Sequence, residues 1–442
     1  MIENSKKAIE KIHEFERFGS ILGLERMNSL LKLLGNPHEE LNVIHVAGTN
    51  GKGSVCRYIY SVLRAAGYKT GIYISPFIET FNERIELNGE YISDEDLAAY
   101  TDRVLKAAKI MTDEGNQSPT EFEVVTAIAL LYFKEKACDY VVLEVGLGGS
   151  GDSTNVCKSP LMTVITSISM DHTDRLGNTI EEIAAEKAGI IKDGCPIVTS
   201  AKDIRALRVI EKAAAEHKSM IFETAGLPVT IKEESLSGCK FDVDIQGVLF
   251  ENLEISMIGG HQVENAVAAL TALSIMEERG AVKLSRQAIF EGFKAAVQPG
   301  RFETIKLSSG TDIEEQAVTV VIDGAHNEDG ARVMAETVKD LFKDKKILMV
   351  VGVLADKDVR RMADRFVKVT NQFIATEPDS PRKLKADRLA EFLKARGAEC
   401  TVAEDYRRAF EEAMKRKDEF DVIIFAGSLY LIGRIRSILK NV

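Results

Sequence analysis

The sharpest chemical signal in the sequence is the segment GTNGKGS, residues 48–54. It follows a predicted buried strand, LNVIHVA, and precedes a predicted helix that ends at Gly67. Glycines let backbone N–H groups turn toward phosphate oxygens, the helix N-terminus adds partial positive charge, and Lys52 can reach the outer phosphates. The spelling is a variant of the usual phosphate loop, because Val46 stands at the first glycine position and Gly53 follows the lysine. We predict a phosphate-binding loop; the alternative is a plain tight turn before a helix.

Three residues that follow or end predicted strands could hold the divalent cation that a nucleoside triphosphate needs. Glu144 lies in the apolar run VVLEVG, where an unpaired carboxylate would be costly, so a metal or a cationic partner is expected. His172 in SMDHTDRLG and Ser75 in YISPF also follow apolar runs, and hard oxygens or an imidazole suit a metal beside phosphates. The structural alternatives are an arginine partner for Glu144, a helix cap for His172 and a turn for Ser75.

The other candidate residues lie on a helix and in the second half of the chain. Lys187, within IEEIAAEKAGIIK, is on a predicted helix, and its residue type alone favours a solvated surface. DGAHN (323–327) and GVLADKD (352–358) follow predicted strands, where they could hold a ribose, a metal-bound phosphate or an amine, or simply cap the next helix. Arg301 follows a Pro-Gly break, and its guanidinium suits phosphate oxygens.

These residues need a scaffold, and the sequence pattern indicates an α/β fold with parallel sheets, because short β-branched runs alternate with longer helical segments. Residues 229–259 predict a small antiparallel sheet, followed by a helix from about Gln262. The predicted strands of the first half are 41–47, 140–146 and 161–169, with an apolar helix over 122–137.

A second, smaller doubly wound sheet is predicted after the Pro-Gly break at 298–303. Its predicted strands are 317–323, 345–354, 371–376 and 421–427. We therefore expect two domains, residues 1–297 and 298–442, with a ligand site at the carboxyl ends of the strands and in a cleft between the domains.

Composition narrows the classes of partner. The 442 residues carry 57 Lys and Arg against 68 Asp and Glu, a formal net charge of -11, which argues against general nucleic-acid or membrane-surface binding. No apolar run approaches a membrane span, and the start of the chain lacks the apolar stretch of a signal peptide, so we expect a cytoplasmic protein. Six scattered cysteines are expected to be reduced and structural, and they do not cluster with histidines at the spacing of a zinc site.

Nearly the whole chain resembles the folylpolyglutamate synthase and dihydrofolate synthase family of the Mur ligase superfamily. The motifs that carry the resemblance are HVAGTNGKGS, SPFIETFNERIELNG, TEFE, EVGLGG, SMDHTDRLGNTIEEIAAEKAGI, GHQVENA, PGRFE, DGAHN and GSLYLIG. The resemblance implies a phosphate-loop-containing N-terminal Mur-ligase-like domain and a smaller Rossmann-like C-terminal domain. It also implies a monomeric ATP-dependent ligase that phosphorylates the carboxylate of a folate or of dihydropteroate and couples the acyl phosphate to the amino group of L-glutamate.

The resemblance also implies roles for particular residues. Lys52, Lys187 and His172 would be catalytic, and Lys187 would be carbamylated, so that two magnesium ions are expected. The metal ligands would be Ser75, Glu144, His172 and Lys187. The ATP contacts would be Gly48, Thr49, Asn50, Gly51, Lys52, Gly53, Ser54, Asn265, Arg301 and Asp323. The substrate-binding residues would be Thr120, Glu121, Phe122, Asp152, Ser153, Thr154 and His326, of which the first six would lie near the pteridine.

One segment departs from the family pattern. After EVGLGG the family usually continues Arg-Leu-Asp, whereas this chain has Ser150, Gly151 and Asp152. A lost guanidinium removes a charge-assisted hydrogen bond worth about 1.5–3 kcal/mol, so the acceptor specificity is open while the metal and phosphate residues are retained. The hypotheses are a folate ligase, a Mur-type amide ligase for a non-folate acid, and a nucleotide-driven switch that makes no amide product.

Overall fold

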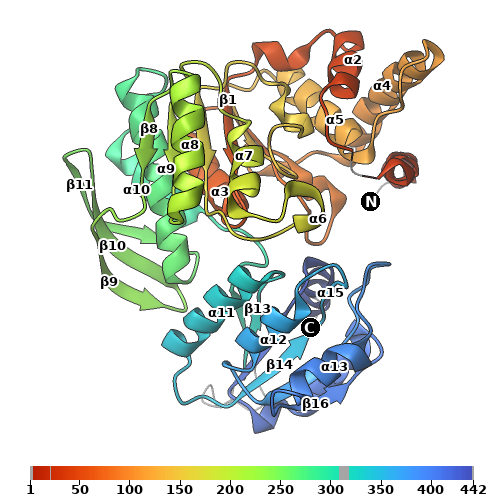
Figure 1. Cartoon of the computed structure of the whole chain (residues 1–442), viewed down its shortest axis with the longest axis vertical. Helices are drawn as coiled ribbons and strands as arrows, with labels where there is room; N and C mark the ends of the chain where they lie inside the picture. The colour runs from red at the N-terminus through yellow and green to blue at the C-terminus, as the bar shows by residue number, and fades with distance from the viewer. Residues whose placement is uncertain (1–2, 20, 308–317, 441–442) are drawn as a thin grey trace. The chain divides into compact units, whose positions relative to one another are not determined.

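The computed structural model describes residues 3–19, 21–307 and 318–440, and the chain forms two compact units (Figure 1). Unit 1 comprises Met1–Thr230, Phe241–Ile255 and Gln262–Ala296; unit 2 comprises Ile231–Lys240, Ser256–His261 and Val297–Val442. The domains expected from sequence, 1–297 and 298–442, stay a prediction. Two short segments before residue 297 belong to unit 2 because side chains such as Leu236 and Ile258 pack against its apolar core.

A large mixed sheet runs through unit 1 in the order β4-β3-β2-β5-β1-β6-β7-β8. The strands from β2 to β8 in that order are parallel, whereas β3 and β4 are antiparallel to their neighbours. Every residue of β1, β2, β5, β6 and β7 is buried, as expected for strands covered on both faces. The strands are β1 (Val43–Ala47), β2 (Thr70–Tyr73), β3 (Ile85–Leu87), β4 (Glu90–Tyr91), β5 (Tyr140–Glu144), β6 (Met162–Ile165), β7 (Ile197–Thr199) and β8 (Ile221–Glu223).

Helices build two apolar cores against this sheet. One core joins α1, α2, α4 and α5 to strand residues such as Tyr73 and Leu143, and the other joins α7 and α8 to Ile165 and Ile197. The α-helices are α1 (Glu3–His13), α2 (Glu25–Leu33), α3 (Lys52–Ala65), α4 (Asp94–Asp113), α5 (Glu121–Glu135), α6 (Thr173–Leu176), α7 (Ile180–Ala188), α8 (Ile204–Glu216), α9 (Gly260–Glu278) and α10 (Arg286–Ala295). Short 3₁₀ turns are η1 (Glu14–Phe18), η2 (Pro37–Glu40), η3 (Phe81–Arg84) and η4 (Ser153–Val156).

The small antiparallel sheet predicted over 229–259 is confirmed, with strand order β11-β10-β9. Its strands are β9 (Val229–Ser235), β10 (Gly238–Ile245) and β11 (Val248–Ile255).

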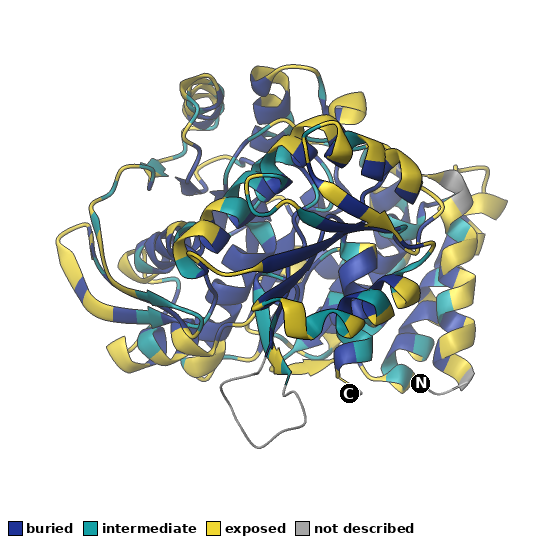
Figure 2. Ribbon diagram, turned by 90° about the horizontal axis from the view of Figure 1, so that it is seen from below, coloured by how far each residue is buried: buried dark blue, intermediate teal, exposed yellow. Residues whose placement is uncertain are grey.

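The main sheet of unit 2 has the order β12-β13-β17-β14-β15-β16, parallel except for β12. Its strands are β12 (Glu303–Leu307), β13 (Val318–Ile322), β14 (Ile347–Val351), β15 (Gln372–Ala375), β16 (Glu399–Val402) and β17 (Val422–Ala426). Its helices are α11 (Glu328–Leu341), α12 (Val359–Phe366), α13 (Ala386–Lys394), α14 (Tyr406–Lys415), the 3₁₀ turn η6 (Lys417–Glu419) and α15 (Leu429–Leu439). Figure 2 shows the strands buried among helices whose outward faces are exposed.

The strands expected from apolar runs are confirmed, with bounds shorter by a few residues at their ends. The six cysteines all lie in the described part of the chain, and all are free thiols. Among the residues that the structure describes, no helix combines the length and apolar character that crossing a bilayer requires.

Candidate active site

The predicted phosphate loop connects the end of β1 to the start of α3, which begins at Lys52, three residues earlier than expected from sequence. Gly48 has φ 146°, and a Cβ atom added to it would lie 1.8 Å from the Thr166 hydroxyl oxygen. Gly51 has φ 89°, and its Cβ would lie 2.4 Å from Oδ1 of Asn265. Both positions therefore need glycine for backbone conformation and for space. Asn265 lies beside the loop at Gly51, and its predicted contact with ATP stays a prediction.

The residues after β6 hold this loop in place. The Thr49 N–H donates to the Ser167 carbonyl at 2.7 Å. The hydroxyls of Thr166 and Ser167 both donate to the Asn50 carbonyl, at 2.7 and 3.1 Å. Sequence reasoning missed these two residues, although hydroxyl side chains directly after a buried strand were a usable signal.

Lys52 and Lys187 meet at one backbone atom, the carbonyl oxygen of Gly48. Each Nζ donates to that oxygen at 3.0 Å, and Lys52 also donates to the Thr49 carbonyl at 3.1 Å. Lys187 is only 4% exposed, so the solvated surface that its residue type favoured is wrong. Burial, followed by the nearby charge of Lys52, lowers the pKa of Lys187 to about 7, so a large share of the amine is neutral near neutral pH.

The structure also brings Ser75 to Glu144, two of the predicted metal ligands. Ser75 lies just beyond β2, and its N–H donates to Oε2 of Glu144 at 3.1 Å. Glu144 ends β5 and is buried. Burial and the charge of Glu144 raise the pKa of the Cys56 thiol, whereas Lys52 acts against that rise, so both charged groups lie near Cys56. A carboxylate thus reaches the neighbourhood of the phosphate loop.

His172 stands at the N-cap position of α6, with a left-handed backbone at φ 50°. Its N–H donates to Oδ1 of Asp171 at 2.9 Å. Asp171 in turn acts electrostatically on Lys187, where its negative charge favours the protonated amine. The motif SMDHTDRLG therefore supplies a carboxylate near Lys187 that sequence reasoning did not single out.

The predicted acceptor residues at the start of α5 have structural roles in the folded chain. Thr120 is the N-cap of α5, and its side chain accepts from the Glu123 N–H while the Glu123 carboxylate accepts from the Thr120 N–H. Glu121 makes an ion pair with His13 at 3.3 Å, which raises the pKa of that histidine. The Phe122 ring lies against Gly146, where a Cβ would approach it to 2.3 Å.

Asp152, Ser153 and Thr154 form a buried network. The Asp152 carboxylate accepts from the Leu147 N–H at 2.8 Å and from the Thr154 hydroxyl at 2.6 Å, and burial raises its pKa. Thr154 also contacts Nε2 of His45 at 2.8 Å. This network fixes the loop after β5, and its assignment to acceptor binding stays a prediction.

Ser150, in the segment that departs from the family pattern, bonds to the helix that carries Lys187. Its hydroxyl donates to Oε2 of Glu186 at 2.5 Å, and its N–H donates to the Glu186 carbonyl at 2.8 Å. The loop between β5 and η4 is therefore fastened to the last turn of α7.

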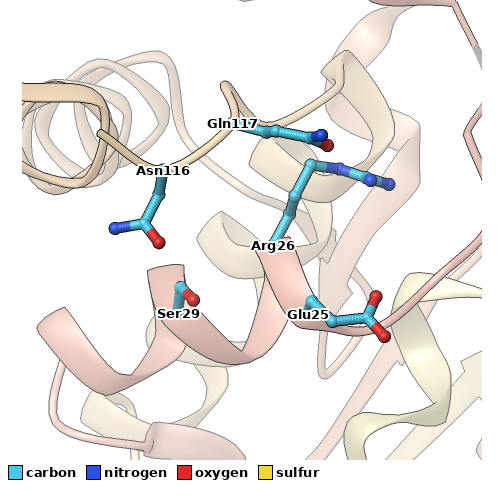
Figure 3. Close-up of a pocket in the computed structure, with 5 residues that line it drawn as sticks. All are labelled: Glu25, Arg26, Ser29, Asn116 and Gln117. Carbon is cyan, nitrogen blue, oxygen red and sulfur yellow. The ribbon is translucent and has the colours of Figure 1, made fainter. Parts of the chain in front are cut away.

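A polar hollow of about 320 Å³ opens between α2 and the loop before α5 (Figure 3). The Arg26 guanidinium at its wall makes a buried ion pair with Glu123 at 3.0 Å and donates to the Ile21 carbonyl at 2.7 Å. The residues lining the hollow are Glu25, Arg26, Ser29, Asn116 and Gln117.

In unit 2 the structure brings together Arg301, Asp323 and His326. The Asp323 carboxylate is buried and accepts from the N–H groups of Phe302 and Ala325 at 2.9 and 2.8 Å. Burial raises the pKa of Asp323, and the charge of Arg301 opposes that rise. Nδ1 of His326 lies 2.8 Å from the Gly324 carbonyl oxygen.

His261 is a further residue of unit 2 that sequence reasoning did not assign. Burial, followed by the charge of Arg301, lowers the pKa of His261 to about 4, so the ring is neutral at neutral pH. The motif GHQVENA, in which it lies, was the available signal.

Two family models match the chain: the Mur ligase middle domain over residues 46–273 and the Mur ligase glutamate ligase domain over residues 300–429. The chain is thus a Mur ligase, an ATP-dependent enzyme that forms a carbon–nitrogen bond. The predicted fold class is confirmed: a phosphate-loop-containing N-terminal Mur-ligase-like domain and a smaller Rossmann-like C-terminal domain.

Similarity to individual proteins identifies the family of Mur ligases to which the chain belongs. The chain is 39% identical over 431 residues to the dihydrofolate synthase/folylpolyglutamate synthase of Bacillus subtilis, covering 97% of each chain. It matches the crystal structure of folylpolyglutamate synthase from Thermotoga maritima with a TM-score of 0.85 and 36% identity, over 99% of this chain and 98% of that one. It matches the Mycobacterium tuberculosis folylpolyglutamate synthase complexed with ADP and AMPPCP with a TM-score of 0.89 and 29% identity, over 99% of both chains. The chain belongs to the folylpolyglutamate synthase and dihydrofolate synthase family.

Proposed function

We propose that this protein uses ATP to add L-glutamate to folates, and also to dihydropteroate, through an acyl-phosphate intermediate. The names of its relatives include both activities. The observation that carries the proposal is the buried Lys187, bonded at 3.0 Å to the same Gly48 carbonyl as the phosphate-loop Lys52. A buried amine of low pKa beside a phosphate loop has a chemical use in such a ligase, whereas a purely structural helix would place an apolar residue there.

The chemistry requires activation of a poor acylating agent. A carboxylate oxygen attacks the outer phosphorus of ATP, ADP leaves, and the resulting acyl phosphate is attacked by the amino group of glutamate with loss of phosphate. In our proposal the charge of Lys52 neutralises the transferring phosphate oxygens. Its hydrogen bonds to the Gly48 and Thr49 carbonyls, which hold the ammonium group at the loop, support this role.

The residues near the loop fit magnesium. Glu144 offers a buried carboxylate, whose Oε2 accepts from the Ser75 N–H at 3.1 Å, so the Ser75 residue lies beside it. The Glu144 carboxylate and the Ser75 hydroxyl are hard oxygen donors of the kind that magnesium prefers. In our proposal Ser75, Glu144, His172 and a carbamylated Lys187 hold two ions. Bound magnesium would supply positive charge that stabilises phosphoryl transfer.

The environment of Lys187 supports the proposal that it is carbamylated. A neutral amine attacks the carbon of CO₂ and releases one proton, which converts the side chain into a carboxylate. The pKa of about 7 makes the neutral amine available at neutral pH. Carbon-13 NMR in labelled bicarbonate should show a carbamate signal that is absent in Lys187→Met, and equal spectra would refute the modification.

For unit 2 the proposal assigns Arg301 and Asp323, with Asn265 of unit 1, to the nucleotide, and His326 to the substrates. The acceptor residues are Thr120, Glu121, Phe122, Asp152, Ser153 and Thr154. We also propose that the enzyme acts as a monomer in the cytoplasm, where its free cysteines stay reduced. Light scattering on the purified protein tests the monomer.

The direct test is an assay with ATP, glutamate and a panel of acceptors. Purified protein should release ADP and give a product heavier by one glutamyl residue with folates and with dihydropteroate. A second candidate is a Mur-type ligase for a non-folate acid, favoured by Ser150 and Gly151, and turnover only with such an acid would select it. Nucleotide-dependent partner binding with no amide product would instead indicate a switch.

A further inference from the structure

Gly151 is packed against a separate loop of unit 1, residues 21–24. The Gly23 N–H donates to the Gly151 carbonyl at 2.9 Å. A Cβ added to Gly151 would lie 2.9 Å from Cβ of Leu22 and 3.0 Å from the Gly23 nitrogen. Gly151 does not have a positive φ, so another residue could adopt its backbone and only the lack of space excludes a side chain. The obstructing atoms are the Gly23 nitrogen and the Cβ and carbonyl carbon of Leu22. None of them can rotate away as the end of a side chain could, so residues 21–24 would have to move as a whole.

The 21–24 loop is held at a second point by Arg26. Arg26 donates to the Ile21 carbonyl at 2.7 Å and pairs with Glu123 at 3.0 Å, where Glu123 caps the start of α5 together with Thr120. The 21–24 loop is thus linked by hydrogen bonds to both segments that carry the predicted acceptor residues. It contacts the segment that leads to Asp152 directly, and the start of α5 through Arg26.

The 21–24 loop presents apolar side chains to solvent at this place. Ile21 is 51% exposed and Leu22 is 36% exposed, and they are neighbours in sequence. Exposed apolar groups that are fixed by backbone hydrogen bonds suit the face of a flat aromatic ligand, which would cover them on binding.

We propose that Gly151 is a positioning residue that sets how closely the 21–24 loop approaches the acceptor. This inference rests on the proposed function, because it takes residues 120–122 and 152–154 as the acceptor site. With no side chain at position 151, Leu22 and Ile21 lie close enough to contact a flat ring system such as that of a pteroate. In this chain, where residues 21–24 pack directly against position 151, a leucine there would force the loop outward and move Ile21 and Leu22 away from the acceptor.

The test compares wild type with Gly151→Ala and Gly151→Leu by two measurements. Calorimetric titration with folate and with dihydropteroate should give dissociation constants about ten- to a hundredfold higher for the variants, since the bound ring would lose its apolar contact with Ile21 and Leu22. The dissociation constant for ADP should stay within about twofold of wild type. Hydrogen exchange at residues 21–24 should be faster in both variants, because the Gly23 N–H loses its acceptor at Gly151.

A double variant provides the matched control. Leu22→Gly removes the Cβ atom that would lie 2.9 Å from a Cβ at position 151 but leaves the Gly23 nitrogen at 3.0 Å, so Leu22→Gly with Gly151→Ala should bring the exchange at Gly23 only part of the way back from Gly151→Ala toward wild type. Gly151→Ala is the milder change and keeps the test valid if Gly151→Leu does not fold.

Failure of this inference and failure of the proposed function would give different results. Unchanged exchange and unchanged acceptor affinity in folded Gly151→Ala overturn the inference. Wild-type protein with no affinity for any pteroate or folate overturns the proposed function instead, and faster exchange at residues 21–24 would then show that the loop contact itself is real.

Discussion

At the scale of single residues, Lys187 is a position where function opposes stability. Lys187 is 4% exposed, and its Nζ shares the Gly48 carbonyl with the Nζ of Lys52. A shared hydrogen bond replaces only part of the hydration that the Lys187 ammonium group has in the unfolded chain, so burying the charged form costs free energy. Its pKa of about 7 expresses that cost, because the folded chain holds the proton less tightly than the unfolded chain does. A chain selected for stability alone would carry an apolar residue here.

Lys187→Met should therefore stabilise the fold at neutral pH while abolishing ligation. In the folded wild type Lys187 loses its proton near pH 7, whereas in the unfolded chain it keeps it up to its usual pKa of 10.5. Between these values the unfolded state binds the extra proton, so raising the pH favours the folded wild type by up to about 1 kcal/mol per pH unit. The advantage of Lys187→Met should be largest at pH 7 and below, and it should shrink toward pH 10.

Urea unfolding of both proteins at pH 7, 8 and 9 in CO₂-free buffer measures this difference, and ADP release measures activity. Lys187→Gln serves as a polar control of similar length. A stability difference that is constant with pH would show that Lys187 titrates normally in the folded chain.

At the scale of elements, the phosphate loop takes its shape from the residues that follow β6. Thr166 and Ser167 donate hydroxyl protons to the Asn50 carbonyl, and the Ser167 carbonyl accepts from Thr49. The loop is therefore held in place by contacts within the protein, which lowers the ordering cost of binding phosphate.

Thr166→Val should weaken nucleotide binding with little effect on the acceptor. The change keeps the shape of the side chain and removes the hydroxyl that lies 2.7 Å from the Asn50 carbonyl, a hydrogen bond worth about 0.5–1.5 kcal/mol. The dissociation constant of ADP should rise about two- to tenfold. Calorimetric titration with ADP measures it.

The matched control for that prediction is Thr163→Val, within β6, the strand that Thr166 directly follows. Thr163 is equally buried, but its hydroxyl contacts Sγ of Cys195 at 3.4 Å and not the loop. Equal losses of affinity in the two variants would mean that β6 acts through general stability and not through the Asn50 carbonyl.

Strands could be predicted from sequence where every residue is buried, because such a strand appears in the sequence as a continuous apolar run. β1, β5 and β14 are buried throughout, and their apolar runs predicted them. β12 and β16 were missed because they lie at the two edges of their sheet and mix exposed with partly buried residues, which gives no apolar run.

The candidate site was predictable to a similar and limited extent. Gly48 and Lys52 stood out because a phosphate loop is contiguous in sequence. The burial of Lys187, the hydroxyls of Thr166 and Ser167, and the contact of Gly151 with Leu22 depend on segments far apart in the chain that the fold brings together. Residue type and spacing along one sequence carry no signal for such contacts.

At the scale of the whole molecule, the two compact units are not continuous stretches of the sequence. Ile231–Lys240 and Ser256–His261 belong to unit 2, although they come before residue 297. Leu236 and Ile258 pack against the same apolar core as Phe302 and Val321 of that unit. The middle of the chain therefore supplies part of a core whose remainder follows much later in sequence.

A fragment of residues 1–297 should consequently fold incompletely and aggregate. Without residues 298–442, Leu236 and Ile258 lose the core that buries them and become exposed apolar surface. The fragment should bind the dye ANS and elute as large species in gel filtration. Leu236→Ser with Ile258→Ser in the same fragment should reduce both effects.

The full-length chain is the control for this prediction. There the same two substitutions remove core contacts, so they should lower the stability of the protein. A fragment that is monomeric, binds no dye and is unaffected by the substitutions would mean that unit 1 folds without regard to these segments.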